Sequence, residues 1–338
     1  MQNRRALVVG IGGGGDAVSA IVAKRYLERT GYEVVLGAVV WERYVVDPYP
    51  GPICSDDLVN FRPVSRSLYW VNKDTEAVRG PNMVKVVPQL ARISRALGTK
   101  GLGICLRYAP GGLSEEIMDF LESQGIDLFV GVDAGGDVLA KGCEEGLASP
   151  LIDFVMLSVM ERLERKGVNV QLGVIGLGSD GELDPNYLLR RIAEIASIGG
   201  LLDIKGYDVE TYSLVSKVLE HVETEASRLP WLAFRGLYGN VEIRNGLRKV
   251  NVTPITSTMF FLKPSAVAKT SPLFEAVKDT ETLEEARRRM NSVGIFTEYD
   301  LEIELFKLTK GKRARTDDIT RVREEGRKAL GGVKLKCE

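Results

Sequence analysis

Three short stretches of this chain combine glycines with carboxylates. They read GIGGGGD, which ends at Asp16, GVDAGGD, which contains Asp133 and Asp137, and GLGSDGELD, which contains Asp180 and Asp184. Glycine-rich turns expose backbone amides, and carboxylates bind hard divalent cations or ligand hydroxyl groups. The recurrence of this combination predicts one acidic, glycine-lined site for a small-molecule ligand.

The first stretch contains four consecutive glycines. It matches the G-x-G-x-x-G pattern as Gly10, Gly12 and Gly15, after an apolar run and before a predicted helix. Amides of such a loop and of the following helix terminus bind phosphate. We therefore expect Gly12, Gly13, Gly14 and Gly15 to contact a cofactor or ligand. The alternative is a tight turn that only lets strand and helix approach each other.

Asp16 follows these glycines directly and would repel a phosphate unless a cation stood between them. This arrangement predicts a Mg²⁺ or Mn²⁺ ion, since hard ions take oxygen ligands and often only one or two carboxylates. The predicted metal ligands are Asp16, Asp133 and Asp137. The competing interpretation is that Asp16 only complements the helix dipole.

The second stretch places Asp133 and Asp137 around two glycines, directly after a buried strand. We predict these two acids to be catalytic and the amides of Gly135 and Gly136 to contact the ligand, although Asp is also common in turns for its own hydrogen bonds. Of the nearby acids Glu144 and Glu145, one is expected to face the site. Glu145 is the predicted third catalytic carboxylate.

The third stretch contains two acids with different expected roles. Asp184 precedes Pro185 and a helical pattern, which is typical of a helix N-cap. Asp180 is therefore the better site candidate.

A second predicted strand ends in VVWER, where Glu42 could hold a ribose hydroxyl group. Together with the first glycine loop, this supports an alternative site for NAD(P) and an oxidoreductase function.

Strand and helix patterns alternate from residue 1 to about residue 200. This predicts an α/β fold with a Rossmann-like, doubly wound, mainly parallel sheet whose strand carboxyl ends share one edge. Residues 201–310 are expected to add a long helix over 209–228 and a hairpin turning at Asn245-Gly246, in the same domain or beside it. Residues 311–338 are expected to form a charged, helical tail.

Composition limits the partners. The formal net charge is −1, from 45 Lys+Arg and 46 Asp+Glu, which argues against nucleic acid and membrane partners. The four scattered cysteines are expected to stay free in the cytoplasm. The single histidine, His221, makes a Ser–His–Asp enzyme or a histidine zinc site improbable. The sequence leaves open whether edge strands of the hairpin in the second half of the chain form a homo-oligomer.

The stretches GIGGGGDAVSA, VVWER and GVDAGGDVLAKGCEEGLASPLID together resemble an archaeal family called domain of unknown function 1152. The resemblance extends over most of the chain. It implies a Rossmann-like α/β fold and gives weight to these loops, but it implies no particular activity.

We therefore expect a metal-assisted hydrolase or phosphoryl transferase acting on a phosphorylated or nucleotide-like metabolite. The alternatives are the NAD(P)-dependent oxidoreductase and a non-catalytic ligand-binding protein.

Overall fold

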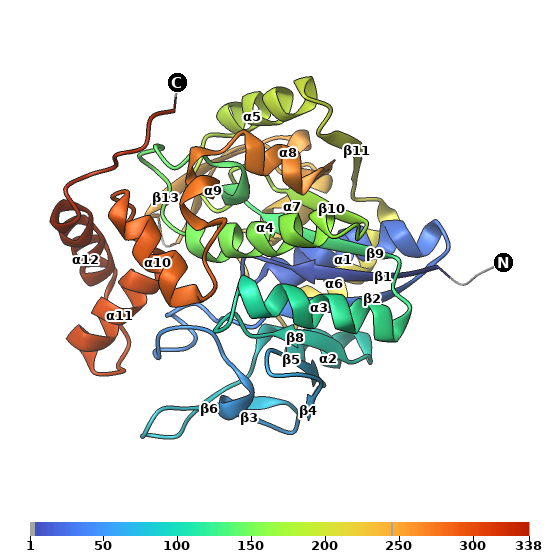
Figure 1. Ribbon diagram of the computed structural model, residues 1–338, viewed down its shortest axis with the longest axis horizontal. Coiled ribbons are helices and arrows are strands. Elements are labelled where there is room, and N and C mark those ends of the chain that lie inside the picture. The colour runs from blue at the N-terminus through green and yellow to red at the C-terminus, as the bar shows by residue number, and fades with distance from the viewer. Residues whose placement is uncertain (1–3, 245, 338) are drawn as a thin grey trace.

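The computed structural model describes residues 4–244 and 246–337. Its centre is a nine-stranded sheet in the order β11-β14-β10-β9-β1-β2-β8-β5-β4. Helices cover both faces of this sheet (Figure 1). The predicted α/β fold with a mainly parallel sheet is confirmed.

The five central strands are parallel. They are β1 (Arg4–Gly10), β2 (Tyr32–Val39), β8 (Gly101–Ile104), β9 (Leu128–Ala134) and β10 (Val170–Ile175). Across the sheet, these strands lie in the chain order third, second, first, fourth, fifth. The strand order thus reverses between β1 and β9, which is where open α/β sheets bind ligands beyond the strand carboxyl ends.

Helices on the two faces complete three layers. One face is covered by α1 (Asp16–Arg29), α2 (Gln89–Leu97) and α6 (Val209–Leu219). The other is covered by α3 (Gly111–Gln124), α4 (Pro150–Arg165) and α5 (Pro185–Ser197). Strands buried on both faces explain the continuous apolar runs of β1 and β9.

Antiparallel strands extend the sheet at one edge. They are β5 (Leu68–Val71) and β4 (Arg62–Pro63), and a small separate sheet contains β3 (Leu58–Val59), β6 (Glu76–Arg79) and β7 (Val84–Val86). These strands of two to four residues are too short to show a period, so the sequence did not predict them.

The opposite edge is formed by the second half of the chain. The strand β14 (Thr258–Leu262) pairs antiparallel with β10 and with β11 (Leu201–Gly206), so the sheet continues past residue 200. The predicted hairpin is present as β12 (Gly239–Ile243) and β13 (Arg248–Val252). Asn245, in its predicted turn, lies outside the described residues.

The single helix predicted over 209–228 is wrong. Helix α6 ends at Leu219, and α7 begins only at Arg228 and ends at Phe234. The segment between them runs to the first glycine loop, where the Ser227 hydroxyl donates a hydrogen bond to the Gly15 carbonyl (2.9 Å). This tertiary contact overrides the local helical pattern.

The prediction of free thiols is also wrong. Cys54 is bonded to Cys105, and Cys143 is bonded to Cys337. Sequence spacing hides both pairs, because their members stand 51 and 194 residues apart.

The remaining helices pack beside α4 and at the end of the molecule opposite the N-terminus (Figure 1). They are α8 (Pro264–Lys269), α9 (Pro272–Val277), α10 (Leu283–Ser292), α11 (Glu298–Thr309) and α12 (Thr316–Ala329). Helix α12 is the helix expected in the charged tail, and its Val322 packs with Tyr44, Phe296 and Leu305. Among the described residues, no helix has the length and apolarity needed to cross a membrane.

Candidate functional site

The three acidic glycine loops follow the carboxyl ends of β1, β9 and β10. These strands are parallel neighbours, so the loops meet at the edge where the strand order reverses. Two groups of buried carboxylates lie there. Within each group, one carboxylate oxygen from every residue lies within 4.8 Å of the others.

The first triad consists of Asp16, Asp133 and Asp153. Their exposed fractions are 8%, 2% and 3%. Asp16 Oδ2 accepts hydrogen bonds from the amides of Gly12 (3.0 Å) and Ala134 (3.3 Å). Asp153 Oδ1 is buried and has no hydrogen-bond partner among the described residues. The first triad is thus rich in carboxyl groups and poor in hydrogen-bond donors.

The second triad consists of Asp137, Asp180 and Glu182, and its hydrogen bonding is different. Glu182 Oε2 accepts from the amides of Ala148 (2.7 Å) and Ser149 (2.9 Å). Its Oε1 accepts from the Ser149 hydroxyl (2.8 Å) and from an Arg248 guanidinium nitrogen (3.0 Å). Asp137 Oδ1, by contrast, is a buried oxygen with no partner in the described part of the chain.

Burial and mutual repulsion shift the pKa values of the first triad upward. Burial raises the pKa of Asp16 to about 7 even though Arg43 opposes the shift. Burial, with the charges of neighbouring acids, raises the pKa of Asp133 and Asp153 well above their ordinary values. Carboxylates that share a site ionise together only when a positive charge joins them.

In the second triad, the pKa values of the three carboxyl groups shift in opposite directions. Burial raises the pKa of Asp180 to about 6, and burial with Asp180 and Glu182 raises that of Asp137 well above its ordinary value. Burial acts on Glu182 in the same direction, but Arg248 and a hydrogen bond with Asp137 outweigh it and lower the pKa of Glu182. The pair therefore combines Glu182, whose ionised form is favoured, with Asp137, whose protonated form is favoured.

The first glycine loop folds around its own acids. A Cβ atom at Gly12 would lie 2.5 Å from Asp16 Oδ2 and 3.0 Å from Asp153 Oδ1. Gly13 and Gly14 have φ angles of +74° and +51°, which favour glycine. A Cβ atom at Gly15 would overlap the Thr224 hydroxyl. The loop thus reverses the chain direction, so that the Asp16 carboxylate lies against the amide of Gly12.

The second glycine turn has the same structural effect. Gly135 and Gly136 have φ angles of +128° and +105°, and a Cβ atom on Gly135 would lie 2.9 Å from Asp180 Cγ. This turn separates Asp133, at the end of β9, from Asp137, in the 3-10 turn Asp137–Leu139. Consequently the three predicted metal ligands are divided, with Asp16 and Asp133 in the first triad and Asp137 in the second.

Glu145 belongs to neither triad. Its side chain is exposed, whereas Glu144 accepts hydrogen bonds from the amides of Lys141 (2.7 Å) and Gly142 (2.8 Å). The expectation that Glu145 faces the site is therefore not met, because the loop directs this side chain to solvent. Asp184 is the predicted N-cap, since its carboxylate accepts from the amide of Tyr187 (3.0 Å).

Glu42, the predicted ribose ligand, is buried at the N-terminus of α2. Its Oε1 accepts a hydrogen bond from the Gln89 amide (2.7 Å), and burial raises its pKa to about 7. The only histidine, His221, has an exposed side chain just after α6.

Sequence reasoning missed several functional candidates. Asp153 stands in the first turn of α4, three residues after Pro150, so the S-P-x-x-D spacing was an available signal. Glu182 could not be singled out from the sequence, because Asp180 and Asp184 stand beside it in the third loop. The arginines near the triads come from distant segments: Arg43 donates to the Gly12 carbonyl (3.0 Å), and Arg248 binds Glu182 from the hairpin.

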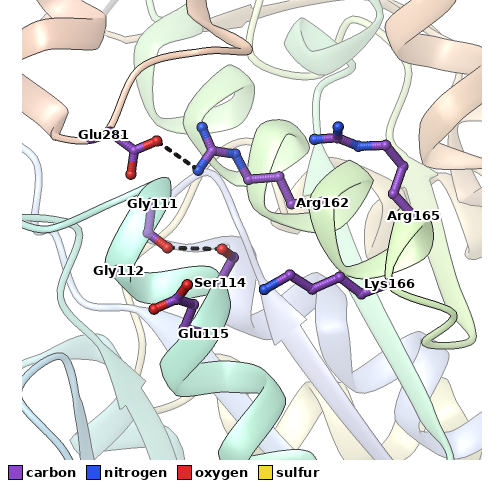
Figure 2. A pocket seen from close by; sticks show the side chains of 8 residues that line it. All are labelled: Gly111, Gly112, Ser114, Glu115, Arg162, Arg165, Lys166 and Glu281. Atoms are coloured by element: carbon purple, nitrogen blue, oxygen red, sulfur yellow. Dashed lines mark hydrogen bonds and ion pairs between the residues drawn. The ribbon is translucent and has the colours of Figure 1, made fainter.

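A surface depression of about 360 Å³ lies apart from both triads, between the start of α3 and the end of α4. Figure 2 shows that its Arg162 points to Glu281 and its Ser114 hydroxyl to the Gly111 carbonyl. None of its lining residues is a triad member. Arg165, which also lines the depression, pairs with Glu161 outside it.

The family model described as Protein of unknown function (DUF1152) matches residues 7–306. The chain belongs to this DUF1152 family. The matched DUF1152 region contains both triads, both glycine turns and the hairpin arginines, and it ends before α12. Comparison with curated proteins and with solved structures found no match.

Proposed function

We propose that this protein is an enzyme that uses a divalent cation to act on a small phosphorylated or nucleotide-like metabolite, by hydrolysis or phosphoryl transfer. The observation that carries the proposal is the first triad. Three carboxylates with oxygens within 4.8 Å of one another are buried at the ligand-binding edge of a Rossmann-type sheet. None of the described basic side chains forms an ion pair with them.

The donor set of the first triad suits Mg²⁺ or Mn²⁺. Both ions prefer oxygen ligands, and Asp153 Oδ1 is an oxygen without a hydrogen-bond partner among the described residues. Asp16, Asp133 and Asp153 would hold the ion. When bound, it would polarise a phosphoryl oxygen and lower the pKa of its own water ligand.

The second triad supplies a proton-carrying group. Burial, with the charges of Asp180 and Glu182, raises the pKa of Asp137 well above its ordinary value and so favours its protonated form. Its unpartnered Oδ1 is the atom suited to deliver a proton to a leaving oxygen. Glu182, held by two amides, the Ser149 hydroxyl and Arg248, positions Asp137 and keeps the proton on it.

The path of the first glycine loop favours this proposal over an NAD(P)-dependent oxidoreductase. In a dinucleotide site, the amides of this loop face a pyrophosphate. Here the Asp16 carboxylate accepts the Gly12 hydrogen bond itself. An anionic side chain in that place supports cation binding, and it supports an enzyme more than a passive ligand-binding protein.

The same proposal sets the partners. The near-balanced charge favours a small-molecule ligand over nucleic acid.

A thermal-shift screen tests the proposal with wild-type protein. Mg²⁺, Mn²⁺ and Ca²⁺ are each combined with nucleotides and sugar phosphates, with NAD⁺ and NADP⁺ as a metal-free comparison. We expect Mn²⁺ or Mg²⁺ to raise the Tm and a phosphorylated metabolite to raise it further. A Tm that responds to dinucleotides without metal, or to none of these compounds, contradicts the proposal.

A further inference from the structure

Two arginines near the second triad have guanidinium groups without an acidic partner among the described residues, although the Arg244 backbone amide donates to the Glu225 carboxylate (3.0 Å). Arg244, directly after β12, and Arg323, in α12, each interact electrostatically with Glu182. Within residues 4–244 and 246–337, neither guanidinium forms an ion pair or a hydrogen bond. Arg248, in contrast, already pairs with Glu182 at 3.0 Å.

The hairpin and α12 bring these arginines close enough to interact electrostatically with each other. Arg248 donates to the Asp180 carbonyl (2.9 Å) as well as to Glu182, which docks the hairpin on the third loop. Arg327 of α12 donates to the carbonyls of Glu145 (3.1 Å) and Leu147, next to the amides that Glu182 binds. Arg323 precedes Arg327 by four residues and therefore lies on the same face of α12.

The local balance of charge favours an additional anion. Glu182 is the ionised member of the second triad, and Arg248 already neutralises it. Burial, together with the charges of Arg248 and Arg244, lowers the pKa of Arg323 to about 10 against the opposing effect of Glu182. Arg244 is exposed to solvent, and the positive charge of Arg248 also lowers its pKa. A bound anion would relieve this repulsion.

We propose that Arg244 and Arg323 bind the dianionic phosphate of a phosphate monoester, which makes a small phosphomonoester the substrate class of this site. This inference rests on the proposed function, because it places the phosphate beside the acids proposed to work on it. Two guanidinium groups provide two positive charges and forked donors for the three terminal oxygens. A phosphodiester has one negative charge and two free oxygens, so it fits this pair less well.

Isothermal titration calorimetry with methyl phosphate and dimethyl phosphate tests the inference, in EDTA and in Mg²⁺. The variants are Arg244→Gln and Arg323→Gln. The matched control is Arg321→Gln, since Arg321 is an exposed arginine of the same helix that pairs with Asp318. Circular dichroism establishes that each variant folds, and either arginine variant alone is sufficient for the test.

We expect methyl phosphate to bind the wild-type protein and the control equally, and each arginine variant about ten- to a hundredfold more weakly. Dimethyl phosphate should bind the wild-type protein at least about tenfold more weakly than methyl phosphate. Equal binding of both esters, or unchanged methyl phosphate binding in a folded arginine variant, overturns the inference.

The two proposals can fail separately. Mn²⁺ binding without any binding of methyl phosphate overturns only this inference. Methyl phosphate binding that depends on Arg244 and Arg323, in a protein that binds no divalent cation, supports this inference and contradicts the cation-dependent function.

Discussion

Buried carboxylates at one sheet edge take different roles because their neighbours differ. Glu182 is ionised because Arg248 and backbone amides stabilise its charge. Asp16 has only two amides as direct partners and a pKa of about 7, and Asp153 has an oxygen with no partner among the described residues. Arg43 compensates these two acids only in part, and no ion pair among the described residues does so, which is the chemical basis for the proposed cation site.

The metal-free protein should lose stability as the pH rises. Asp16 has a folded-state pKa of about 7 against an ordinary value of 3.8, so between these values the folded protein holds a proton that the unfolded chain has lost. The free energy of unfolding therefore falls as the pH rises through this window. Above about pH 7 the stabilising contribution of the Asp16 proton is lost. Asp16→Asn removes one such group and should flatten the pH dependence.

Urea unfolding at pH 5 and pH 8 without divalent cations measures this effect. The decrease from pH 5 to pH 8 should be smaller in Asp16→Asn than in the wild-type protein. Added Mg²⁺ should stabilise the wild-type protein more at pH 8, where protons no longer compete. Identical pH dependence in both proteins would contradict the raised pKa of Asp16.

Replacing Glu182 should destabilise the protein strongly. Glu182→Ala leaves Arg248 without its ion pair and the amides of Ala148 and Ser149 without their acceptor. Loss of one partner from a buried pair costs about 3–5 kcal/mol. The matched control is Glu145→Ala, whose exposed side chain should change the free energy of unfolding by less than about 0.5 kcal/mol. Similar urea midpoints for both variants would count against this role of Glu182.

At the scale of elements, strand β1 and helix α1 approach so closely that only glycine fits between them. A Cβ atom on Gly10 would lie 2.5 Å from the Ala17 amide nitrogen and 2.6 Å from the Asp16 carbonyl carbon. Both are backbone atoms that cannot rotate away. The helix terminus, and with it Asp16, would have to move.

Gly10→Ala should therefore cost about 1–3 kcal/mol of stability and weaken cation binding. Gly98→Ala is the control, because Gly98 has a φ of +67° but nothing within 4 Å of its Cβ position. Gly98→Ala should lose only about 1 kcal/mol of stability, because alanine is strained at a positive φ, and it should bind cations normally. Unfolding in urea and Mn²⁺ titration separate the two variants, and normal cation binding by Gly10→Ala would refute this role of the close approach.

Local patterns predicted the regular elements well and the contacts between elements poorly. The alternation of strands and helices up to residue 200 and the hairpin around Gly246 were readable because period and turn chemistry are local signals. The break between α6 and α7 was not, since it depends on Ser227 reaching Gly15. The pairing of β14 with β10 likewise depends on residues far apart in the chain.

The sequence predicted where the candidate site lies but not which acids lie together in it. The three acidic loops were predicted to lie on one sheet edge because they follow parallel strands. Which acids share a triad depends on the glycine turns and on α4, so Asp137 was predicted to lie with Asp16 and Asp133 but lies with Asp180 and Glu182, and Asp153 was not predicted. Glu145 was a choice between adjacent acids that no spacing rule could decide.

For the whole molecule, the Cys143–Cys337 bond ties the end of the chain to the loop beside the second triad. Its members are 194 residues apart, and a bond closing so long a segment restricts the unfolded chain strongly. Cys337→Ser should lower the free energy of unfolding by about 2–4 kcal/mol without reductant. Dithiothreitol should abolish the difference from the wild-type protein, and a difference of the same size in dithiothreitol would argue against the bond.

Cation binding by the first triad is the most direct test of the proposed function. Isothermal titration calorimetry with Mn²⁺ compares the wild-type protein with Asp153→Asn, which changes one carboxylate of nearly constant shape. One ion should bind per wild-type chain, and its affinity should fall at least about tenfold in a folded Asp153→Asn. Absence of Mn²⁺ binding by the wild-type protein, or equal affinity in both proteins, would contradict a cation site in the first triad.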